Sequence, residues 1–146
     1  MFGLFIHGKM LQIMRDDLMV QQQVDNVWQH MVGVICLNCT NRKQVKAVLP
    51  SFFKRWPTHK AFLHATKKQI EEVIAPLGMR TVRAERLYRM SEQFGDWDGN
   101  DATKLYGIGK YGSDSYELFY KKRVPENIGD HELKRYVEEE FYETLD

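Results

Sequence analysis

The chain has 146 residues, of which 43% are hydrophobic and 28% charged, an ordinary globular composition that excludes disordered and fibrous proteins. The formal net charge is only +1, but the last nine residues, 138–146, contain five acidic and no basic side chains. Residues 1–137 therefore carry 21 basic against 15 acidic side chains, a mildly basic body that excludes neither nucleic acid nor protein partners.

The N-terminal residues 1–7 are apolar, but this stretch is too short for a secretory signal with its cleavage site. No later run is long and apolar enough to cross a bilayer. We therefore expect an intracellular protein with no membrane partner. The length suits one domain over residues 1–146 with an acidic tail at 138–146, and we find no internal repeat.

Helical periodicity begins near residue 24. Apolar residues form an almost continuous face from 24 to 37 and recur at spacings of three and four from 41 to 56. Pro57 ends the second pattern, whereas Pro50 falls inside it and is expected to kink or restart the helix. A short helical piece is expected at 58–65. These segments predict a helical first half.

The helical pattern continues to residue 94. Thr66 and Gln69 form a capping box that opens the next helix, and Pro76 to Gly78 end it. A further helix is expected at about 81–94, before a polar loop at 95–100. No segment alternates with period two for long enough to predict a strand, so we expect an all-α fold. The side chains expected to face inward from the 81–94 helix are Val82, Leu87, Met90 and Phe94.

Basic residues recur on two of these helices. One carries Lys43, Lys46, Lys54 and Arg55, and the other carries Arg80, Arg83, Arg86 and Arg89 at every third position. Such rows are usually solvated faces, but they also suit a surface that binds nucleic acid. The sequence leaves both interpretations open.

The cysteines and histidines do not form a metal-site pattern. Cys36 and Cys39 make a single Cys-x-x-Cys, no second pair follows, and no His-x-x-x-His occurs. We expect Cys36 to be buried and Cys39 to be partly exposed at a helix end. No metal, iron-sulfur cluster or other cofactor is expected.

Two glycines organise the last third of the chain. Gly107 and Gly109 flank Ile108, with a short helix expected ahead of them and a second one from 110 to 121, so they lie in a tight helix-to-helix hairpin at about 101–121. Glycine suits this turn because it takes positive φ cheaply and lets another backbone approach closely. The start of the second helix offers free N–H groups to a phosphate, and Lys110 can add positive charge.

Asp130 lies about twenty residues beyond the hairpin, immediately before the apolar-periodic stretch that starts at His131. The commonest reason for Asp at such a place is an N-cap. A carboxylate held rigidly by capping can also stabilise positive charge in a reaction, so the two roles are compatible.

The hairpin resembles the helix-hairpin-helix of the DNA glycosylase superfamily related to endonuclease III. Over residues 18–140 the chain is most similar to the glycosylase domain of the methyl-CpG-binding mismatch thymine glycosylases. The segments that carry this resemblance are 36–40, 75–80, 83–84, 105–116 and 130–136.

The resemblance implies a fold, a reaction and several residue roles. It implies two helical lobes with a DNA-binding cleft between them, and a monofunctional enzyme that flips a mismatched or damaged pyrimidine, thymine or uracil opposite guanine, and hydrolyses its N-glycosidic bond. Asp130 matches the catalytic aspartate. Tyr111 matches a base-pocket tyrosine that stands where bifunctional relatives carry a Schiff-base lysine. Met79 matches the apolar wedge that fills the vacated stack, with Arg80 beside it as a DNA contact.

Three positions qualify the resemblance. The family's arginine finger is replaced by Cys39, and the lysine that it carries two residues beyond the aspartate is replaced by Glu132. Gln21 aligns, after a one-residue gap, with a glutamine that binds the pyrimidine edge, although an exposed glutamine is an equal alternative for this position.

The family resemblance predicts a monomer that binds double-stranded DNA, located in the nucleus of a eukaryote or in the cytoplasm or nucleoid of a prokaryote or virus. Two alternatives stay open. One is a base-modification enzyme on the same scaffold, and the other is a non-catalytic helix-hairpin-helix DNA-binding module.

Overall fold

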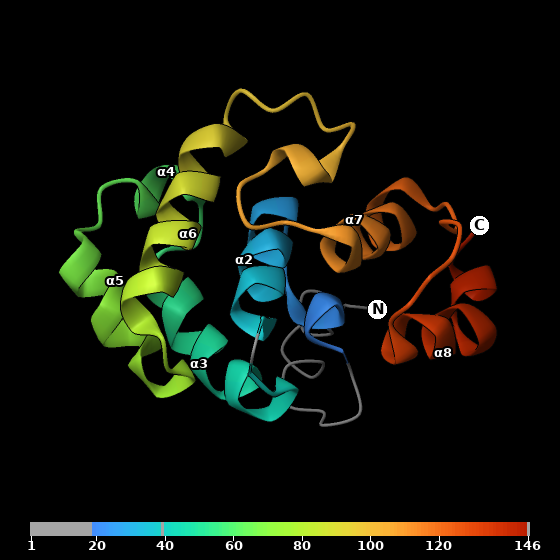
Figure 1. Ribbon diagram of the computed structural model, residues 1–146, viewed down its shortest axis with the longest axis horizontal. Coiled ribbons are helices and arrows are strands. Elements are labelled where there is room, and N and C mark those ends of the chain that lie inside the picture. The colour runs from blue at the N-terminus through green and yellow to red at the C-terminus, as the bar shows by residue number, and fades with distance from the viewer. Residues whose placement is uncertain (1–18, 39, 146) are drawn as a thin grey trace.

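The computed structural model describes residues 19–38 and 40–145, and all regular structure in these ranges is helical (Figure 1). The expected all-α class is thereby confirmed. None of the helices in the described ranges is long and apolar enough to span a membrane. The elements are η1 (Val20–Gln23), α2 (Val27–Leu37), α3 (Arg42–Arg55), α4 (His59–Phe62), α5 (Lys67–Ile74), η2 (Ala75–Leu77), α6 (Arg80–Phe94), η3 (Ala102–Lys104), α7 (Lys110–Tyr116), η4 (Glu117–Lys121), α8 (His131–Glu139) and η5 (Phe141–Thr144).

Helix α2 lies in the middle of the molecule, with α3 to α6 on one side of it and α7 and α8 on the other (Figure 1). It packs on α3, α6 and α7, and α5 packs along α6. The π-helix η4 continues α7 directly, so the expected helix from 110 to 121 is present as one run with a wider last part. This arrangement places the chain segments before α2 and after α7 next to each other.

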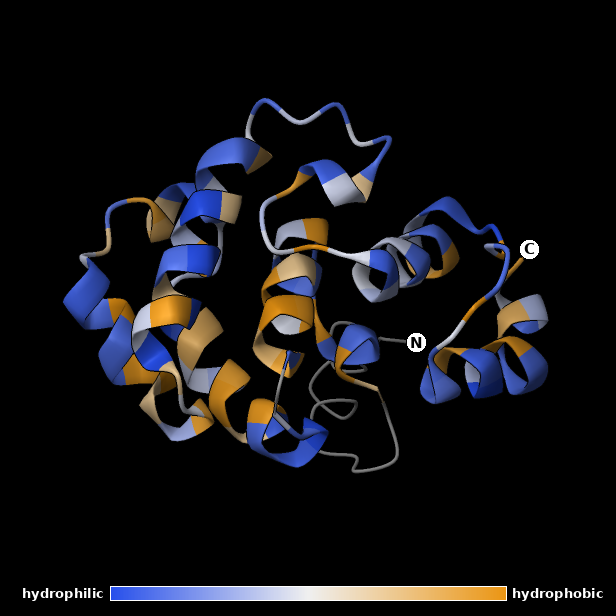
Figure 2. Cartoon of the chain, viewed as in Figure 1, coloured by the Kyte–Doolittle hydropathy of each residue, from blue (hydrophilic) through white to orange (hydrophobic). Residues whose placement is uncertain are grey.

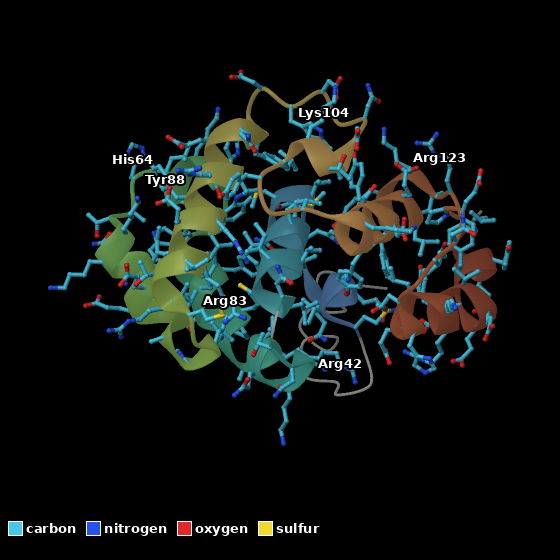
Figure 3. All side chains as sticks on the ribbon, viewed as in Figure 1. Arg42, His64, Arg83, Tyr88, Lys104 and Arg123 are labelled. Carbon is cyan, nitrogen blue, oxygen red and sulfur yellow. The ribbon has the colours of Figure 1, made fainter. Side chains whose placement is uncertain are left out.

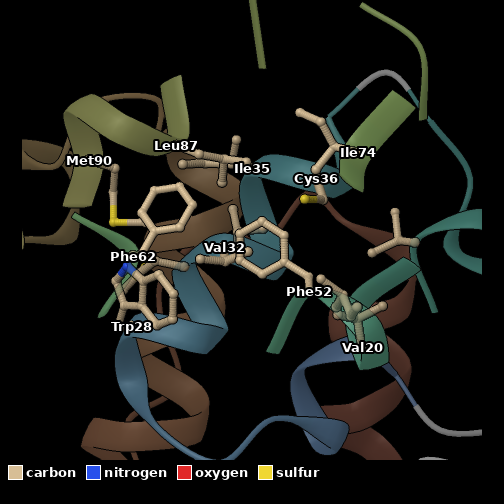
Figure 4. Close-up of a cluster of buried hydrophobic side chains, with 14 of the residues drawn as sticks. Val20, Trp28, Val32, Ile35, Cys36, Phe52, Phe62, Ile74, Leu87 and Met90 are labelled. Carbon is tan, nitrogen blue, oxygen red and sulfur yellow. The ribbon is translucent and has the colours of Figure 1, made fainter. Parts of the chain in front are cut away.

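The main hydrophobic core surrounds the buried face of α2 (Figure 4). Trp28 lies 5.6 Å from Phe62 and 6.3 Å from Phe52, measured between ring centroids, and all three side chains are almost fully buried. Burying one such aromatic side chain contributes about 1.5–3 kcal/mol. The indole N–H of Trp28 donates to Ser91 Oγ at 2.8 Å, so its polar atom is satisfied. This core fixes the position of α2, whose C-terminal end lines the cavity described below.

A second, smaller core holds α8 in place. It contains Met19, Leu118, Leu133, Tyr136 and Phe141, and the rings of Phe119 and Tyr136 stack with centroids 4.4 Å apart. Tyr111 packs against both cores. Helix α8 turns its hydrophilic residues outward, as the colouring in Figure 2 shows. The apolar stripe of α8 is therefore what positions the start of this helix.

Side-chain caps set the helix starts. Asn26, Asn41, Thr58 and Thr66 each accept a hydrogen bond from the backbone N–H three residues later, and Thr66 completes the predicted capping box with Gln69. Helix α2 consequently begins at Val27 rather than at residue 24. Of the two expected effects of Pro50, a kink or a restart, the restart does not occur, because α3 runs through this residue. Pro50 lies on the exposed face, where water can satisfy the carbonyl group that loses its helical donor.

The predicted hairpin is present. A 3₁₀-turn, η3, leads through Gly107 at φ +83° into α7, and Ile108 is 5% exposed and points inward. Only Gly107 needs positive φ, since Gly109 has φ −106°. The closest packing is at Gly112, where an added Cβ would lie 2.7 Å from Ile108 Cγ2 and 2.9 Å from Val34 Cγ1. Gly107 thus supplies the positive φ of the turn and Gly112 permits close packing, whereas Gly109 needs neither.

Helix α6 differs from expectation at two positions. Val82 was expected to face inward but is 43% exposed, and Arg83 is 2% exposed. The guanidinium of Arg83, a residue labelled in Figure 3, donates to the carbonyl oxygens of three residues, Leu77, Gly78 and Asn38. A buried guanidinium is tolerated because these acceptors satisfy it. The row of α6 arginines is therefore not one solvated face.

Candidate active site

A cavity of about 470 Å³ opens where η1, the end of α2, the start of α3, the hairpin and the start of α8 meet. Several residues expected at a functional site line it together, although they are far apart in the sequence. They are Gln21, Gly107, Gly109, Lys110, Tyr111 and Asp130. The lining also includes Met19, Val20, Val34, Leu37, Asn38, Arg42, Gly112 and Glu132.

Gln21 and Tyr111 form the polar wall of this cavity. Gln21 is 5% exposed, and its Nε2 donates a hydrogen bond to Tyr111 Oη. Gln21 Oε1 is buried without a hydrogen-bond partner in the described part of the chain. Buried polar atoms are rarely left unpaired because this costs about 1–3 kcal/mol. An acceptor of this kind beside a cavity is suited to a ligand that brings a donor.

The Tyr111 phenol is held in its neutral form. Its burial, reinforced by the negative charges of Asp130 and Glu132, raises its pKa to about 12. Because the phenol oxygen accepts from Gln21, its own O–H remains available to donate to a ligand. Tyr111 and Gln21 thus offer a donor and an acceptor side by side.

Gln21 is fixed by its neighbours in η1. Gln22 accepts from the Met19 backbone N–H at 2.9 Å, and its Nε2 donates to Glu140 Oε1 at 3.0 Å. These contacts tie η1 to the end of α8. The open question of whether Gln21 is an exposed glutamine is settled, since it is a buried residue of the cavity wall.

Asp130 is the N-cap of α8. Its Oδ2 accepts a hydrogen bond from the Leu133 backbone N–H at 2.9 Å, as expected for a cap. Its other carboxylate oxygen makes no hydrogen bond among the described residues. The side chain is half-buried and lines the cavity. Capping therefore holds one oxygen and leaves the second available, an arrangement that can present a rigid negative charge to a ligand.

Glu132, at the position of the family's lysine, has a cationic partner in the same cavity that no sequence pattern predicted. Arg42 Nη1 is 3.3 Å from Glu132 Oε1, and Arg135 Nη2 is 3.2 Å from the same oxygen. Arg42 comes from the start of α3, and its position is labelled in Figure 3. One signal was present, because a basic residue in the first turn opposes the helix dipole and calls for another reason. The cavity therefore contains a cation although position 132 carries a carboxylate.

The hairpin presents its backbone at one edge of the cavity. An added Cβ at Gly109 would meet no atom within 4 Å, so the space in front of this residue is open. The Lys110 ammonium group lies 2.7 Å from Asp114 Oδ2 and donates to the Glu126 carbonyl oxygen at 3.1 Å. Lys110 is thus already paired in the free protein and would have to leave Asp114 to contact a phosphate.

Met79 and Arg80 do not line the cavity. Met79 is 56% exposed in the left-handed conformation at φ 46°, directly after Gly78 at φ 77°. Arg80 is exposed and lies 4.0 Å from Glu71. The turn that carries Met79 is held by the hydrogen bonds from Arg83 to Leu77 and Gly78. Cys39, the remaining expected DNA contact, lies outside the described residues.

The buried Cys36 and His30 stand apart from the cavity. Burial raises the pKa of the Cys36 thiol to about 12 and lowers the pKa of His30 to about 3. His30 Nε2 is 2.7 Å from Ser115 Oγ, whereas Nδ1 has no partner in the described part of the chain. The expected burial of Cys36 is confirmed. Within residues 19–38 and 40–145, no group of three or more potential ligands could hold a metal ion.

Comparison with known proteins gives a consistent set of similarities. Residues 32–140 match the family described as HhH-GPD superfamily base excision DNA repair protein. The chain is 28% identical over 123 residues to the methyl-CpG-binding domain protein 4-like protein of Arabidopsis thaliana, a match that covers 82% of this chain and 27% of the relative. It is 32% identical over 121 residues to a thymine/uracil-DNA glycosylase of Pyrobaculum aerophilum, covering 78% and 52%. The chain thus spans between about a quarter and a half of these relatives.

Two solved structures share the fold. A thermostable thymine-DNA glycosylase aligns with a TM-score of 0.59 and 20% identity, over 83% of this chain and 59% of that one. A non-covalent endonuclease III–DNA complex aligns with a TM-score of 0.64 and 13% identity, over 82% and 60%. At these identities the likeness concerns the arrangement of the helices.

Proposed function

Because the chain belongs to the HhH-GPD superfamily of base excision DNA repair proteins, we propose that it is a DNA glycosylase that excises a pyrimidine flipped out of double-stranded DNA. The family assignment confirms the expected resemblance. The observation that carries the proposal is the cavity in which the buried, unpaired Gln21 Oε1 lies beside the neutral Tyr111 phenol, with Asp130 in the same wall. The similarity to a thymine/uracil-DNA glycosylase supports the same chemistry.

The cavity suits the hydrogen-bonding edge of thymine or uracil. Gln21 Oε1 can accept from the N3–H of the base, and the Tyr111 hydroxyl can donate to an adjacent carbonyl oxygen. A site built around such groups rejects a ligand that leaves them unpaired. We assign Gln21 and Tyr111 to base recognition. The proposed target is thymine or uracil opposite guanine.

The chemistry falls to Asp130. Breaking the N-glycosidic bond develops positive charge on the sugar, and a fixed carboxylate beside it stabilises this charge and orients the attacking water. The cap geometry supplies the rigidity, since Leu133 N–H holds one oxygen at 2.9 Å. Excision would stop at an abasic site, because Tyr111 occupies the position of the Schiff-base lysine and a phenol forms no imine.

DNA would be held by the groups that surround the cavity. We assign Gly107 and Gly109 to phosphate contacts of the hairpin backbone, with Lys110 joining them after it leaves Asp114. Met79 is the candidate wedge because it is the most exposed methionine side chain in the described part and stands on a turn fixed by Arg83.

The proposal is tested with duplexes that contain one G·T, G·U, G·C or A·T pair. Wild-type protein should produce abasic sites in the first two duplexes under single-turnover conditions. Gln21→Leu should lower this rate by about tenfold or more, because one hydrogen bond to the base is lost from a buried site. Tyr111→Phe should also lower it. Gel-shift affinity for the G·C duplex, which depends on phosphate contacts, should be unchanged in both variants.

Two results would contradict the proposal. If wild-type protein forms no abasic site in any of these duplexes yet binds them, the non-catalytic or base-modification alternative gains. If Gln21→Leu excises thymine and uracil as fast as wild type, Gln21 does not contact the base.

A further inference from the structure

A second groove, of about 650 Å³, adjoins the candidate active site on the hairpin. The two share Asn38, Gly107 and Gly109 in their linings. The side chains that line the groove include two cations, Arg86 and Lys104, and no carboxylate. A neighbouring groove around Trp97 shares part of this lining, including Lys104, but differs because Glu92, Asp96 and Asp98 also line it. The hairpin groove is therefore suited to an anion.

The four arginines of α6 differ in their partners. Arg83 is buried against carbonyl oxygens, Arg80 lies 4.0 Å from Glu71, and Arg89 lies 2.6 Å from Glu85. Arg89 is also 5.0 Å above the ring of Tyr106. Arg86 makes no ion pair or side-chain hydrogen bond among the described residues. The sequence spacing made these four arginines look equivalent, whereas their surroundings separate one from the rest.

Arg86 is held at a fixed place relative to the hairpin. A Cβ added to Gly107 would lie 3.8 Å from Arg86 Cβ, so the side chain starts beside the turn. Gln93, two turns further along α6, accepts from the Tyr106 backbone N–H at 2.6 Å and ties the hairpin to this helix. The backbone and Cβ from which the Arg86 guanidinium extends are therefore fixed beside the hairpin, within the groove lining.

Lys104 adds a weaker charge. It stands on η3 at the outer edge of the molecule (Figure 3). Hydrogen bonds from Asn100 lower the pKa of Asp98 and hydrogen bonds from Thr103 lower that of Asp101, and the positive charge of Lys104 adds a smaller decrease to both. The carboxylates of Asp98 and Asp101 thus partly neutralise the charge of Lys104. Arg86 is the principal cation of the groove.

We propose that this groove binds the DNA backbone next to the flipped nucleotide, with Arg86 contacting a phosphate beyond those held by Gly107 and Gly109. The inference rests on the proposed function, because it takes the ligand of the adjoining cavity to be DNA. Arg86 is a binding residue in this assignment and takes no part in bond breaking.

The test is the salt dependence of binding. Each phosphate that a protein cation neutralises makes the slope of log K against log salt steeper by about 0.9. Relative to 1 M salt, this contact strengthens binding about eightfold at 0.1 M salt. Arg86→Ala should therefore lower the slope by about 0.9 and weaken binding about eightfold, equally for G·T and G·C duplexes. Arg86→Lys should retain most of the slope. The single-turnover rate of Arg86→Ala at saturating protein should stay within twofold of wild type.

Arg89→Ala is the matched control. It removes the same charge from the same helix, but from a guanidinium that Glu85 already pairs, so its slope and affinity should stay close to those of wild type. Arg86→Gln, which keeps the aliphatic stem, replaces Arg86→Ala if the latter lowers the melting temperature.

The outcomes separate this inference from the proposed function. An unchanged slope in Arg86→Ala, an equal loss in Arg89→Ala, or a loss confined to the G·T duplex would overturn the inference. If wild-type protein excises no base but its binding still depends on Arg86 in the expected way, the groove stands and the glycosylase assignment fails. If wild-type protein excises the base and the salt slope does not depend on Arg86, the glycosylase assignment stands and the groove assignment fails.

Discussion

Replacing Asp130 by Asn separates the cap from the chemistry. Asp130 Oδ2 accepts from the Leu133 backbone N–H at 2.9 Å. Asn caps almost as well as Asp, so its amide oxygen should take over this bond. The amide NH₂ group then lies where the free carboxylate oxygen was. The substitution thus exchanges a negative acceptor for a donor with partial positive charge at the point where the transition state needs the negative charge.

The magnitudes for rate and for stability differ widely. Losing a preorganised electrostatic partner costs on the order of 10²-fold or more in rate, which corresponds to about 2.7 kcal/mol. The cap in Asp130→Asn should change stability by only a few tenths of a kcal/mol. Asp130→Ala loses the cap as well, at a cost of about 1 kcal/mol, or about 2–4 °C in melting temperature for a chain of this size.

The assay combines three measurements on G·T and G·U duplexes: the single-turnover rate of abasic-site formation, the gel-shift affinity and the melting temperature. Asp130→Asn should keep the gel-shift affinity and the melting temperature of wild type and should lose the excision rate. Asp101→Asn is the matched control, since Asp101 caps η3 through Thr103 N–H and does not line the cavity. An Asp130→Asn variant that excises as fast as wild type would show that Asp130 is only a cap.

Two further predictions concern the reaction type and the pH dependence of stability. Borohydride should trap no covalent complex with substrate DNA, because Tyr111 forms no imine and the Lys110 amine is paired with Asp114; robust trapping would refute the monofunctional assignment. Burial lowers the pKa of His30 to about 3, so between about pH 3 and 6.5 the unfolded chain binds a proton that the folded chain does not. The contribution of His30 to the free energy of unfolding is complete above about pH 6.5. Below that pH the free energy of unfolding falls by about 1.4 kcal/mol per pH unit, which amounts to about 2 kcal/mol at pH 5. In urea titrations at pH 7 and pH 5, His30→Gln should lose that part of the pH dependence, and an equal dependence in both proteins would contradict this account.

Local patterns in the sequence were enough for the elements of the fold. The helix starts at Asn41, Thr58 and Thr66 and the cap at Asp130 depend on residues at most four positions apart, and each is present as expected. The hairpin could be placed because Gly107 and Ile108 carry a local requirement, for positive φ and for burial. Pro50 shows the limit of such rules, because its effect on α3 depends on whether the lost hydrogen bond faces water.

The family resemblance also predicted many residues of the candidate site. Gln21, Tyr111 and Asp130 line one cavity, together with the hairpin glycines. Their roles stay predictions, but their proximity is a fact of the structure. Arg42 was missed because its partner Glu132 is ninety positions away, and no local pattern links the two.

Only the tertiary structure decided the state of each charged or polar side chain. The spacing of the α6 arginines is regular, yet Arg83 is buried because carbonyl groups of two other segments converge on it, while Arg86 faces a groove without a carboxylate. Likewise, Gln21 is buried because η1 packs against α2 and α3, which places Gln21 within hydrogen-bonding distance of Tyr111. Periodicity and capping fix the secondary structure because they act within one or two helical turns. Burial, ion pairing and unpaired acceptors depend on which distant segments meet, and so they follow from the packing of the helices.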